Sequence, residues 1–277
     1  MKVSVISMMA GINKRPRTLI FDLDNTLIWD ERSVKEAFEA VCLFAQQEAG
    51  VDGEALEALA REEAERLFRS YDTYGYAEAI EVTELEALWA RFDRGDHPML
   101  RKLEEIAPVY RREVWRNALS RAGADGEKAD DLSSKLAERF MAERRSRPFV
   151  YDDTFTVLTA LKPTHRMVLL TNGDPSLQQE KVDGVQGLGE FFERVFISGH
   201  YEVGKPYSII YEKVLEELGE EVRDCWMIGD NMLTDIKGAN GIGMTSVWLN
   251  RYGREPIEGM KPSYSVSSLS ELAALLA

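Results

Sequence analysis

The sequence predicts an α/β fold in which a doubly wound parallel sheet, Rossmann-like in its core, carries an inserted all-helical domain. Two observations predict this fold. Short apolar runs of strand length alternate with amphipathic helical stretches, and one long internal region contains no strand-like run. Alternating strands and helices are typical of a parallel sheet covered on both faces. The strandless region favours a separate helical unit between the first and second strands.

Five short apolar runs are expected to form the strands of the sheet. Each is rich in Val, Ile and Leu and ends in polar or glycine-bearing residues, as strands buried on both faces do. The runs are Arg17–Asp22, Arg166–Thr171, Arg194–Ser198, Asp224–Asp230 and Met244–Leu249. Amphipathic helices are expected between the later runs, at Pro206–Leu218 and Thr234–Asn240.

The region from about Ser33 to Arg147 is dense in Ala, Leu, Glu and Arg. It is long enough to form an all-helical domain of its own. We therefore predict a discontinuous α/β core made of residues 1–32 and 148–277, with residues 33–147 as the helical insertion.

Local signals predict where helices of this insertion begin and break. Ser33 and Glu36 have the spacing of a capping box, and so do Thr83 and Glu86. Pro108 is expected to kink the helical stretch around it or to divide it in two, because proline lacks an amide N–H.

Length and charge limit the kinds of function. A chain of 277 residues fits one large domain or two modest ones, at roughly 100–200 residues per domain. Lys and Arg number 34 against 48 for Asp and Glu, so the net charge is −14. That acidity argues against nucleic acid or an anionic membrane as the main partner. A small anionic substrate is still allowed, because it responds to the local field of a pocket.

The remaining composition indicates a cytoplasmic protein. No apolar stretch approaches the roughly 20 residues that a membrane-spanning helix needs. The segment Met1–Gly11 is too short and too weakly flanked for a secretory signal, and we expect it to be an N-terminal extension. Cys42 and Cys225 each lie in an apolar run, which favours two buried thiols in a reducing compartment.

Two acids follow the first predicted strand. Asp22 ends the apolar run, and Asp24 would lie on the same side if the chain stayed extended. In an open α/β sheet, ligands bind beyond the carboxyl ends of the strands. Two carboxylates this close repel one another unless a cation or a shared proton lies between them. A divalent cation is the simplest remedy, and Mg²⁺ suits a site that also holds water and phosphate.

Polar groups also follow the second strand and a later loop. Thr171 and Asn172 end the second run and are able to cradle phosphate oxygens, although ordinary strand-to-turn chemistry explains them equally well. Lys205 lies in a tight loop just before a helix, where a solvated lysine is the plain alternative.

A second pair of acids completes the pattern. Asp230 ends another buried run, and Asp235 follows it, where it would by itself serve only to cap the next helix. Together with Asp22 and Asp24, Asp230 predicts an oxygen-rich cluster at adjacent strand ends.

These four stretches, in order, resemble the four motifs of the haloacid dehalogenase-like hydrolase superfamily. The motifs are a DxDxT acid pair, a strand-end Thr, a Lys, and a GDxxxxD acid pair. The resemblance covers the whole α/β core, and the helical insertion falls where that superfamily often carries a cap. The run from Leu169 to Asn250 looks most like the phosphatase branch that holds N-acylneuraminate-9-phosphatase and pyrimidine 5′-nucleotidases.

The resemblance implies a phosphoric monoester hydrolase. Asp22 matches the nucleophile, which would attack phosphorus and form an aspartyl-phosphate. Asp24 matches the general acid/base, which would protonate the leaving alkoxide and later activate water.

The resemblance also implies a Mg²⁺ site and a phosphate site. Its metal ligands would be the Asp22 and Asp230 carboxylates and the Asp24 main-chain carbonyl, with Asp235 supporting them. The residues expected to bind the transferring phosphoryl group are Thr171, Asn172 and Lys205, and Lys205 would also neutralise charge on the nucleophile.

Three other functions are weighed against this one. Dehalogenases of the superfamily carry no acid at the position of Asp24, and its phosphomutases usually have Gly where this chain has Thr26. A catalytically silent member that binds a phosphorylated ligand or a partner protein is the third. The sequence favours a Mg²⁺-dependent phosphatase of small phosphorylated metabolites whose cap closes over the site. It names neither the substrate nor the oligomeric state.

Overall fold

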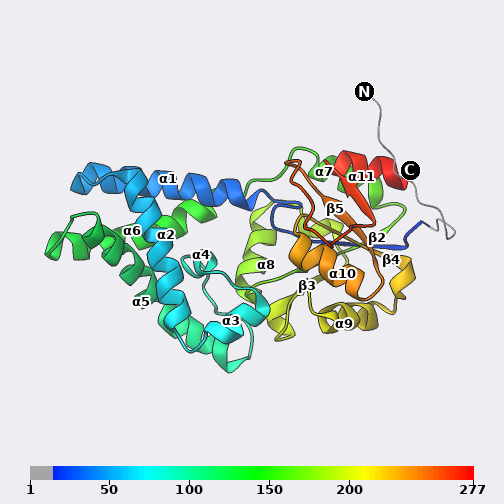
Figure 1. Cartoon of the computed structure of the whole chain (residues 1–277), viewed down its shortest axis with the longest axis horizontal. Helices are drawn as coiled ribbons and strands as arrows, with labels where there is room; N and C mark the ends of the chain where they lie inside the picture. Colours follow the sequence, from blue (N-terminus) through cyan, green and yellow to red (C-terminus); the bar gives the residue numbers. More distant parts are fainter. Residues whose placement is uncertain (1–14) are drawn as a thin grey trace.

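The structure is a computed structural model that describes residues 15–277, and it has two parts lying side by side (Figure 1). The predicted N-terminal extension, Met1–Gly11, lies outside the described residues. One part is an α/β core, and the other is a unit of helices inserted after the first strand. Among the described residues, no helix is long and apolar enough to cross a membrane.

The core is built on one parallel sheet in the order β3-β2-β1-β4-β5-β6. Its strands are β1 (Thr18–Phe21), β2 (Arg166–Thr171), β3 (Val195–Ile197), β4 (Cys225–Gly229), β5 (Thr245–Leu249) and β6 (Tyr264–Val266). All five predicted runs form strands, and the predicted fold class is confirmed. The sixth strand was not predicted, because it is short, lies at the edge of the sheet and has an exposed serine at its centre.

Helices cover both faces of this sheet. They are α7 (Thr154–Leu161), α8 (Pro175–Gly184), α9 (Ser208–Leu218), α10 (Lys237–Gly241) and α11 (Leu269–Leu276). Side chains of β1 alternate between the faces: Leu19 and Phe21 pack with α7 and α11, and Ile20 packs with α9 and α10. Short helical turns complete the core: η1 (Gly189–Phe191), η2 (Ser198–His200), η3 (Val222–Asp224) and η4 (Met232–Ile236).

The helical insertion forms a cap with an apolar core of its own. Its helices are α1 (Asp30–Ala49), α2 (Gly53–Ser70), α3 (Tyr74–Ile80), α4 (Glu84–Ala87), α5 (Pro98–Arg121) and α6 (Glu127–Arg145). Helix α5 packs between α2 and α6, and α1 packs on the same two helices. Leu177 of the core helix α8 joins the apolar cluster of the cap, so α8 lies at the junction of the two parts. The domain boundaries at residues 32 and 147 remain a prediction.

The predicted start of the first cap helix is wrong. Helix α1 begins at Asp30 after Trp29, and no side chain caps it. The N–H of Ser33 instead donates to the carbonyl of Trp29 (3.2 Å), and Ser33 is buried inside the helix. The chain therefore enters the helix as soon as it leaves the core, before the capping-box pattern is reached.

The other two local signals have different outcomes. The capping box of Thr83 and Glu86 is present, although the helix that it opens ends at Ala87. Helix α5 is not divided at Pro108, which lies inside it. Cys42 and Cys225 are both buried and free, as predicted.

Candidate active site

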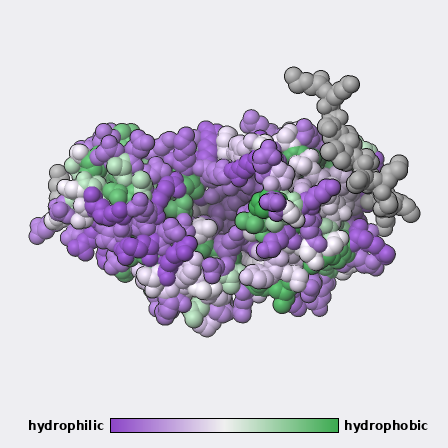
Figure 2. Space-filling model, viewed as in Figure 1, coloured by the Kyte–Doolittle hydropathy of each residue, from purple (hydrophilic) through white to green (hydrophobic). Residues whose placement is uncertain are grey.

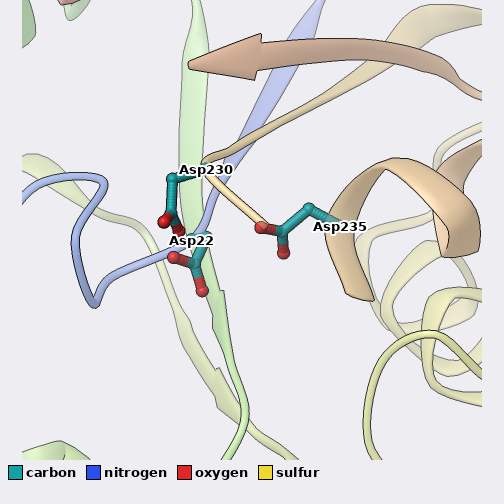
Figure 3. Close-up of side chains that lie close together, drawn as sticks. All are labelled: Asp22, Asp230 and Asp235. Carbon is teal, nitrogen blue, oxygen red and sulfur yellow. The ribbon is translucent and has the colours of Figure 1, made fainter. Parts of the chain in front are cut away.

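Three carboxylates from separate segments converge at the carboxyl edge of the sheet (Figure 3). Asp22 directly follows β1 and Asp230 directly follows β4, and these two strands are neighbours. Asp235 lies in η4, a short π-helix that begins just after Asp230. One oxygen of each carboxylate lies within 4.8 Å of the others, so the three could hold one metal ion.

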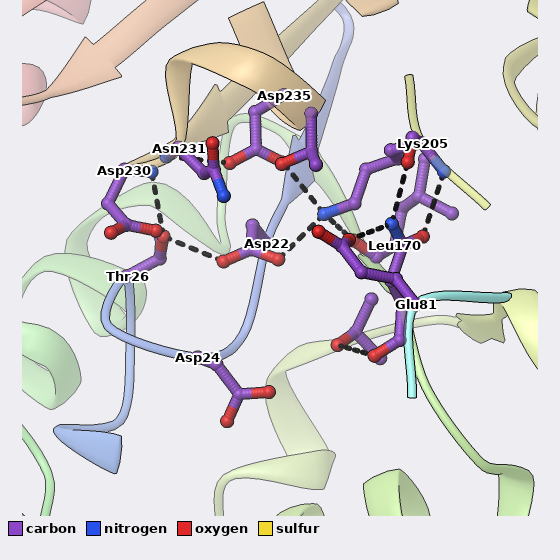
Figure 4. A network of polar contacts seen from close by, with 12 residues as sticks. Asp22, Asp24, Thr26, Glu81, Leu170, Lys205, Asp230, Asn231 and Asp235 are labelled. Atoms are coloured by element: carbon purple, nitrogen blue, oxygen red, sulfur yellow. Dashed lines mark hydrogen bonds and ion pairs between the residues drawn. The ribbon is translucent and has the colours of Figure 1, made fainter. Parts of the chain in front are cut away.

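Lys205 pairs with two of these acids (Figure 4). Its Nζ lies 2.7 Å from Asp22 Oδ1 and 2.7 Å from Asp235 Oδ1, and it also donates to the carbonyl of Leu170. The side chain is buried, which by itself would lower the pKa of Lys205. The two adjacent carboxylates outweigh burial and raise that pKa well above its ordinary value. Lys205 is therefore a fixed cation beside Asp22, and the alternative of a solvated lysine is wrong.

Thr26 links the two strand-end loops. Its hydroxyl donates to Asp22 Oδ2 (2.9 Å) and accepts the N–H of Asp230 (3.1 Å). The Asp230 carbonyl accepts from the indole N–H of Trp248 (2.8 Å), so the main chain of Asp230 is held on both sides. The sequence identified Thr26 as part of the DxDxT pattern and as a departure from the phosphomutases, but it did not predict this role.

The acid cluster carries more negative charge than Lys205 can balance. Burial raises the pKa of Asp22 to about 6, and Lys205 lowers it only in part. Burial and the nearby Asp22 and Asp235 raise the pKa of Asp230 to about 8. A site made only of carboxylate oxygens with unbalanced charge fits a hard divalent cation such as Mg²⁺. The carboxylate of Asp235 is itself part of this cluster, whereas it was predicted only to support the metal ligands.

The side chain of Asp24 lies apart from the cluster (Figure 4). The expectation that Asp22 and Asp24 share one side required an extended chain, but β1 ends at Phe21 and the chain turns. The Leu23 carbonyl accepts the amide N–H groups of three residues that follow. The Asp24 carboxylate instead accepts from Lys181 Nζ (2.9 and 3.0 Å) and Gln178 Nε2 (2.9 Å).

Helix α8 supplies these two donors, which sequence reasoning missed. Gln178 and Lys181 are both buried, and they lie on one face of the helix because they are three positions apart. Burial raises the pKa of Asp24 to about 6, although Lys181 opposes the shift. Neither residue belongs to a recognisable motif, so only the structure identifies them.

The two polar residues at the end of β2 are held by the loops around them. Thr171 Oγ1 accepts from Gln178 Nε2 (2.6 Å). Asn172 Oδ1 accepts the N–H of Lys205 (2.9 Å), and its Nδ2 donates to the Lys205 carbonyl (2.9 Å). Asn172 thus fixes the main chain of the loop that carries Lys205. Contact of either residue with a phosphoryl group remains a prediction.

A cap segment docks on the same strand-end loops. The N–H of Gly204 donates to the Ala79 carbonyl (2.9 Å), and the hydroxyl of Ser198 donates to the Ile80 carbonyl (2.6 Å). The carboxylate of the next residue, Glu81, accepts from the amide of Asn172. Glu81 has a left-handed backbone (φ 60°), a strained state for a non-glycine residue that the docking maintains. No sequence signal distinguishes this segment, which lies in an ordinary acidic helical region.

A cavity of about 660 Å³ lies between the cap and the core. The cavity is lined by candidate residues at the ends of β1, β2 and β4, among them Asp22, Thr171 and Asp230. Arg61 and Trp89 of the cap also line it. The surface between the two parts is hollowed and mainly hydrophilic (Figure 2). The acid cluster is therefore reachable from solvent by a ligand that the cap also touches.

Comparison with known proteins agrees with this geometry. The model of one family, the haloacid dehalogenase-like hydrolases, matches residues 16–243. The chain belongs to this family. A phosphoserine phosphatase from Thermus thermophilus is 36% identical over 92% of this chain and 97% of its own length. The N-acylneuraminate-9-phosphatase of Mus musculus is 30% identical, over 95% of this chain and 94% of its own.

Other relatives and a solved structure complete the comparison. Pyrimidine 5′-nucleotidases of Escherichia coli and Streptococcus pneumoniae are also related, so the resemblance predicted from the motifs is confirmed. The HAD-hydrolase YfnB of Bacillus subtilis, solved bound to magnesium, superposes with a TM-score of 0.65 at 20% identity. That match covers 95% of this chain and 99% of the other, and it shows that the two chains share a fold.

Proposed function

We propose that this haloacid dehalogenase-like hydrolase is a Mg²⁺-dependent phosphatase that hydrolyses small phosphorylated metabolites through an aspartyl-phosphate on Asp22. The observation that carries the proposal is the convergence of Asp22, Asp230 and Asp235 around one point beside Lys205. This arrangement supplies a nucleophilic carboxylate, a site for a cation and a fixed positive charge within one pocket.

Asp22 is the proposed nucleophile. Thr26 and Lys205 hold its two oxygens from opposite sides, which fixes the direction of the carboxylate. Attack on phosphorus forms an acyl phosphate and releases the alcohol, and water then hydrolyses that intermediate. Lys205 reduces the repulsion between the anionic nucleophile and the anionic ester.

The Asp22, Asp230 and Asp235 carboxylates and the Asp24 main-chain carbonyl are the proposed Mg²⁺ ligands. Mg²⁺ bound there would neutralise charge on the phosphoryl oxygens. Thr171 and Asn172 are proposed to donate to the transferring group from the end of β2. The proposed role of the Asp24 side chain is to give a proton to the leaving oxygen and later to take one from water.

The substrate class follows from the cavity and the relatives. A cavity of about 660 Å³ that the cap and core share suits a metabolite rather than a phosphorylated protein. Relatives that cover most of the chain are named for phosphoserine, N-acylneuraminate 9-phosphate and pyrimidine 5′-nucleotides. These three kinds of compound are therefore the first to test, by release of inorganic phosphate.

The proposal is tested with p-nitrophenyl phosphate and Mg²⁺, comparing the wild type with Asp22→Asn. The wild type is expected to release p-nitrophenol and to stop when EDTA removes the metal, and the variant is expected to be inactive. Equal release by both proteins would remove the Asp22 mechanism. No release by either, on this ester and on the three metabolite classes, would favour the silent ligand-binding member instead.

A further inference from the structure

Lys181 on α8 is a buried cation that the reaction proposed above does not use. Its side chain is 3% exposed, and its Nζ lies 2.9 Å from Asp24 Oδ2. The same Nζ donates to Glu86 Oε1 of the cap at 2.9 Å. A buried ammonium group is costly unless opposite charges pair with it. Burial would lower the pKa of Lys181, but the acids around it raise that pKa, so it stays charged.

The acids around Lys181 come from both parts of the molecule. Asp24 belongs to the core, Glu86 to the cap helix α4, and Asp30 to the start of α1, with Asp30 Oδ1 3.8 Å from Lys181 Nζ. Asp30 also pairs with Arg144 of α6 at 2.6 Å. Asp30 and Arg144 lie on the two segments through which the chain enters and leaves the cap. Lys181 therefore lies where the core, the cap and both connections meet.

Lys181 contacts three acids that line the large cavity. The described residues that line the large cavity include Asp24, Asp30 and Glu86 but not Lys181. A substrate in that cavity would meet the Asp24 carboxylate, and Lys181 would lie behind it.

We propose that Lys181 is a positioning residue, which holds the Asp24 carboxylate in place and ties this placement to docking of the cap through Glu86. The inference rests on the proposed proton-transfer role of Asp24. Without Lys181, the three neighbouring carboxylates would keep one charged partner among the contacts described, Arg144, beside the uncharged donors of Gln178 and Thr83. Their repulsion would turn Asp24 out of place and release Glu86. The docking of the cap would loosen, although the contacts of Ala79, Ile80 and Glu81 with the core would remain.

The test compares wild type and Lys181→Met on two esters that differ in the leaving group. Phenyl phosphate releases a basic phenolate that needs a proton, whereas p-nitrophenolate leaves without one. The variant is expected to lower kcat/KM on phenyl phosphate about 100-fold, within the usual range for a lost proton transfer. The loss on p-nitrophenyl phosphate is expected to be less than about tenfold on the same grounds. The two esters are compared by kcat/KM because this ratio covers the steps up to release of the alcohol, whereas hydrolysis of the shared aspartyl-phosphate also affects kcat.

Two further variants and a second readout support the comparison. Lys213→Met removes an exposed lysine of α9 and is expected to match the wild type in every measurement. Glu86→Gln keeps the capping contact with Thr83 but removes the charge that faces Lys181. Small-angle X-ray scattering is expected to show a larger radius of gyration for Lys181→Met and Glu86→Gln. The ratio of the two esters is expected to change most in Lys181→Met and less in Glu86→Gln, which leaves Lys181 paired with Asp24.

Several results would overturn the inference. Equal losses of kcat/KM on both esters would show that Lys181 supports only the fold, and no loss would show that Asp24 does not depend on it. A wild type inactive on both esters and on the three metabolite classes would remove the proposed function. Small-angle X-ray scattering would then still test whether Lys181 holds the cap on the core. A radius of gyration unchanged in Lys181→Met would reject that role.

Discussion

Single side chains at the ends of β1 and β4 determine the charge of the candidate site. The pKa of Asp230 is raised to about 8, which is further than the pKa of Asp22, raised to about 6. The cause is burial together with two like charges, Asp22 and Asp235. A bound divalent cation would remove that repulsion, so the stability of the protein is expected to depend on Mg²⁺ through this residue.

Asp230→Asn is expected to abolish stabilisation by Mg²⁺. Wild type at a Mg²⁺ concentration of about 100 times Kd should gain about 2.7 kcal/mol in the free energy of unfolding. The variant should gain nothing. Without metal and near neutral pH it should be more stable than the metal-free wild type, because folding then no longer has to protonate a buried carboxyl of pKa about 8 or hold its charge beside two acids. Thermal unfolding in EDTA and in Mg²⁺ measures both effects.

The matched control is Asp131→Asn, which changes an exposed acid of the cap helix α6. It should keep the full response to Mg²⁺. A full response in Asp230→Asn as well would mean that Asp230 is not a ligand.

Sequence alone predicted some of these side chains and not others. The meeting of Asp22 and Asp230 was predictable, because both directly follow buried parallel strands whose carboxyl ends share an edge. The position of the Asp24 carboxylate was not, since it depends on the turn after β1 and on donors from α8. Such donors are ordinary polar residues of a helix until tertiary packing brings them to the site.

At the scale of elements, the end of β4 leaves room for the helix that follows it. Gly229 is the last residue of β4, and a Cβ atom there would lie 2.1 Å from Asp235 Oδ2. The π-helix η4 brings Asp235 back over the strand end, and Lys205 holds that carboxylate from the other side. A glycine is therefore required for the acid cluster to close.

Gly229→Ala is expected to disturb the metal site although it changes no charged group. Crowding of this kind typically costs about 1–3 kcal/mol in the free energy of unfolding. The displaced Asp235 should also weaken Mg²⁺ binding, which titration calorimetry measures.

Gly241→Ala is the control, because a Cβ at that position of α10 meets nothing within 4 Å. It should leave Mg²⁺ binding unchanged. Wild-type affinity for Mg²⁺ in Gly229→Ala would show that Asp235 is not needed in the cluster.

Elements were predicted best where burial alone determines them. The five buried strands follow from their apolar runs, whereas the edge strand β6 is short and partly polar. The start of α1 was misplaced because a capping pattern is a local signal, and the connection from the core begins the helix earlier at Asp30.

At the scale of the whole molecule, the net charge of −14 opposes the anions that the site is proposed to bind. Long-range repulsion acts over about 30 Å at 0.01 M ionic strength and about 8 Å at 0.15 M. Many acids line the cavity besides the proposed ligands, among them Glu31, Glu81 and Glu255. Screening should therefore help a phosphate ester to approach.

Raising the NaCl concentration over that range is expected to increase kcat/KM for p-nitrophenyl phosphate, by at most about tenfold. Mg²⁺ is kept saturating, so that weaker metal binding does not enter the comparison. Sucrose at equal osmolality is the control and should have no such effect. A steep fall in kcat/KM with salt would contradict the prediction and show that local cations of the cavity attract the substrate from a distance.

The insertion as a helical unit was predictable from its composition, but its contacts with the core were not. Glu81 reaches Asn172 at the end of β2, and Glu86 reaches Lys181 of α8. No local pattern in the sequence indicates either contact. Long-range placement of this kind depends on the packing of α1, α2, α5 and α6 as a unit.

The last two residues of α3 dock on the core through their main-chain oxygens, and this has an evolutionary consequence. Gly204 and Ser198 bond to main-chain oxygens, which every amino acid possesses, so substitutions at Ala79 or Ile80 leave both acceptors in place. Substitutions can therefore accumulate at this end of α3 across related proteins without the loss of these two contacts with the core.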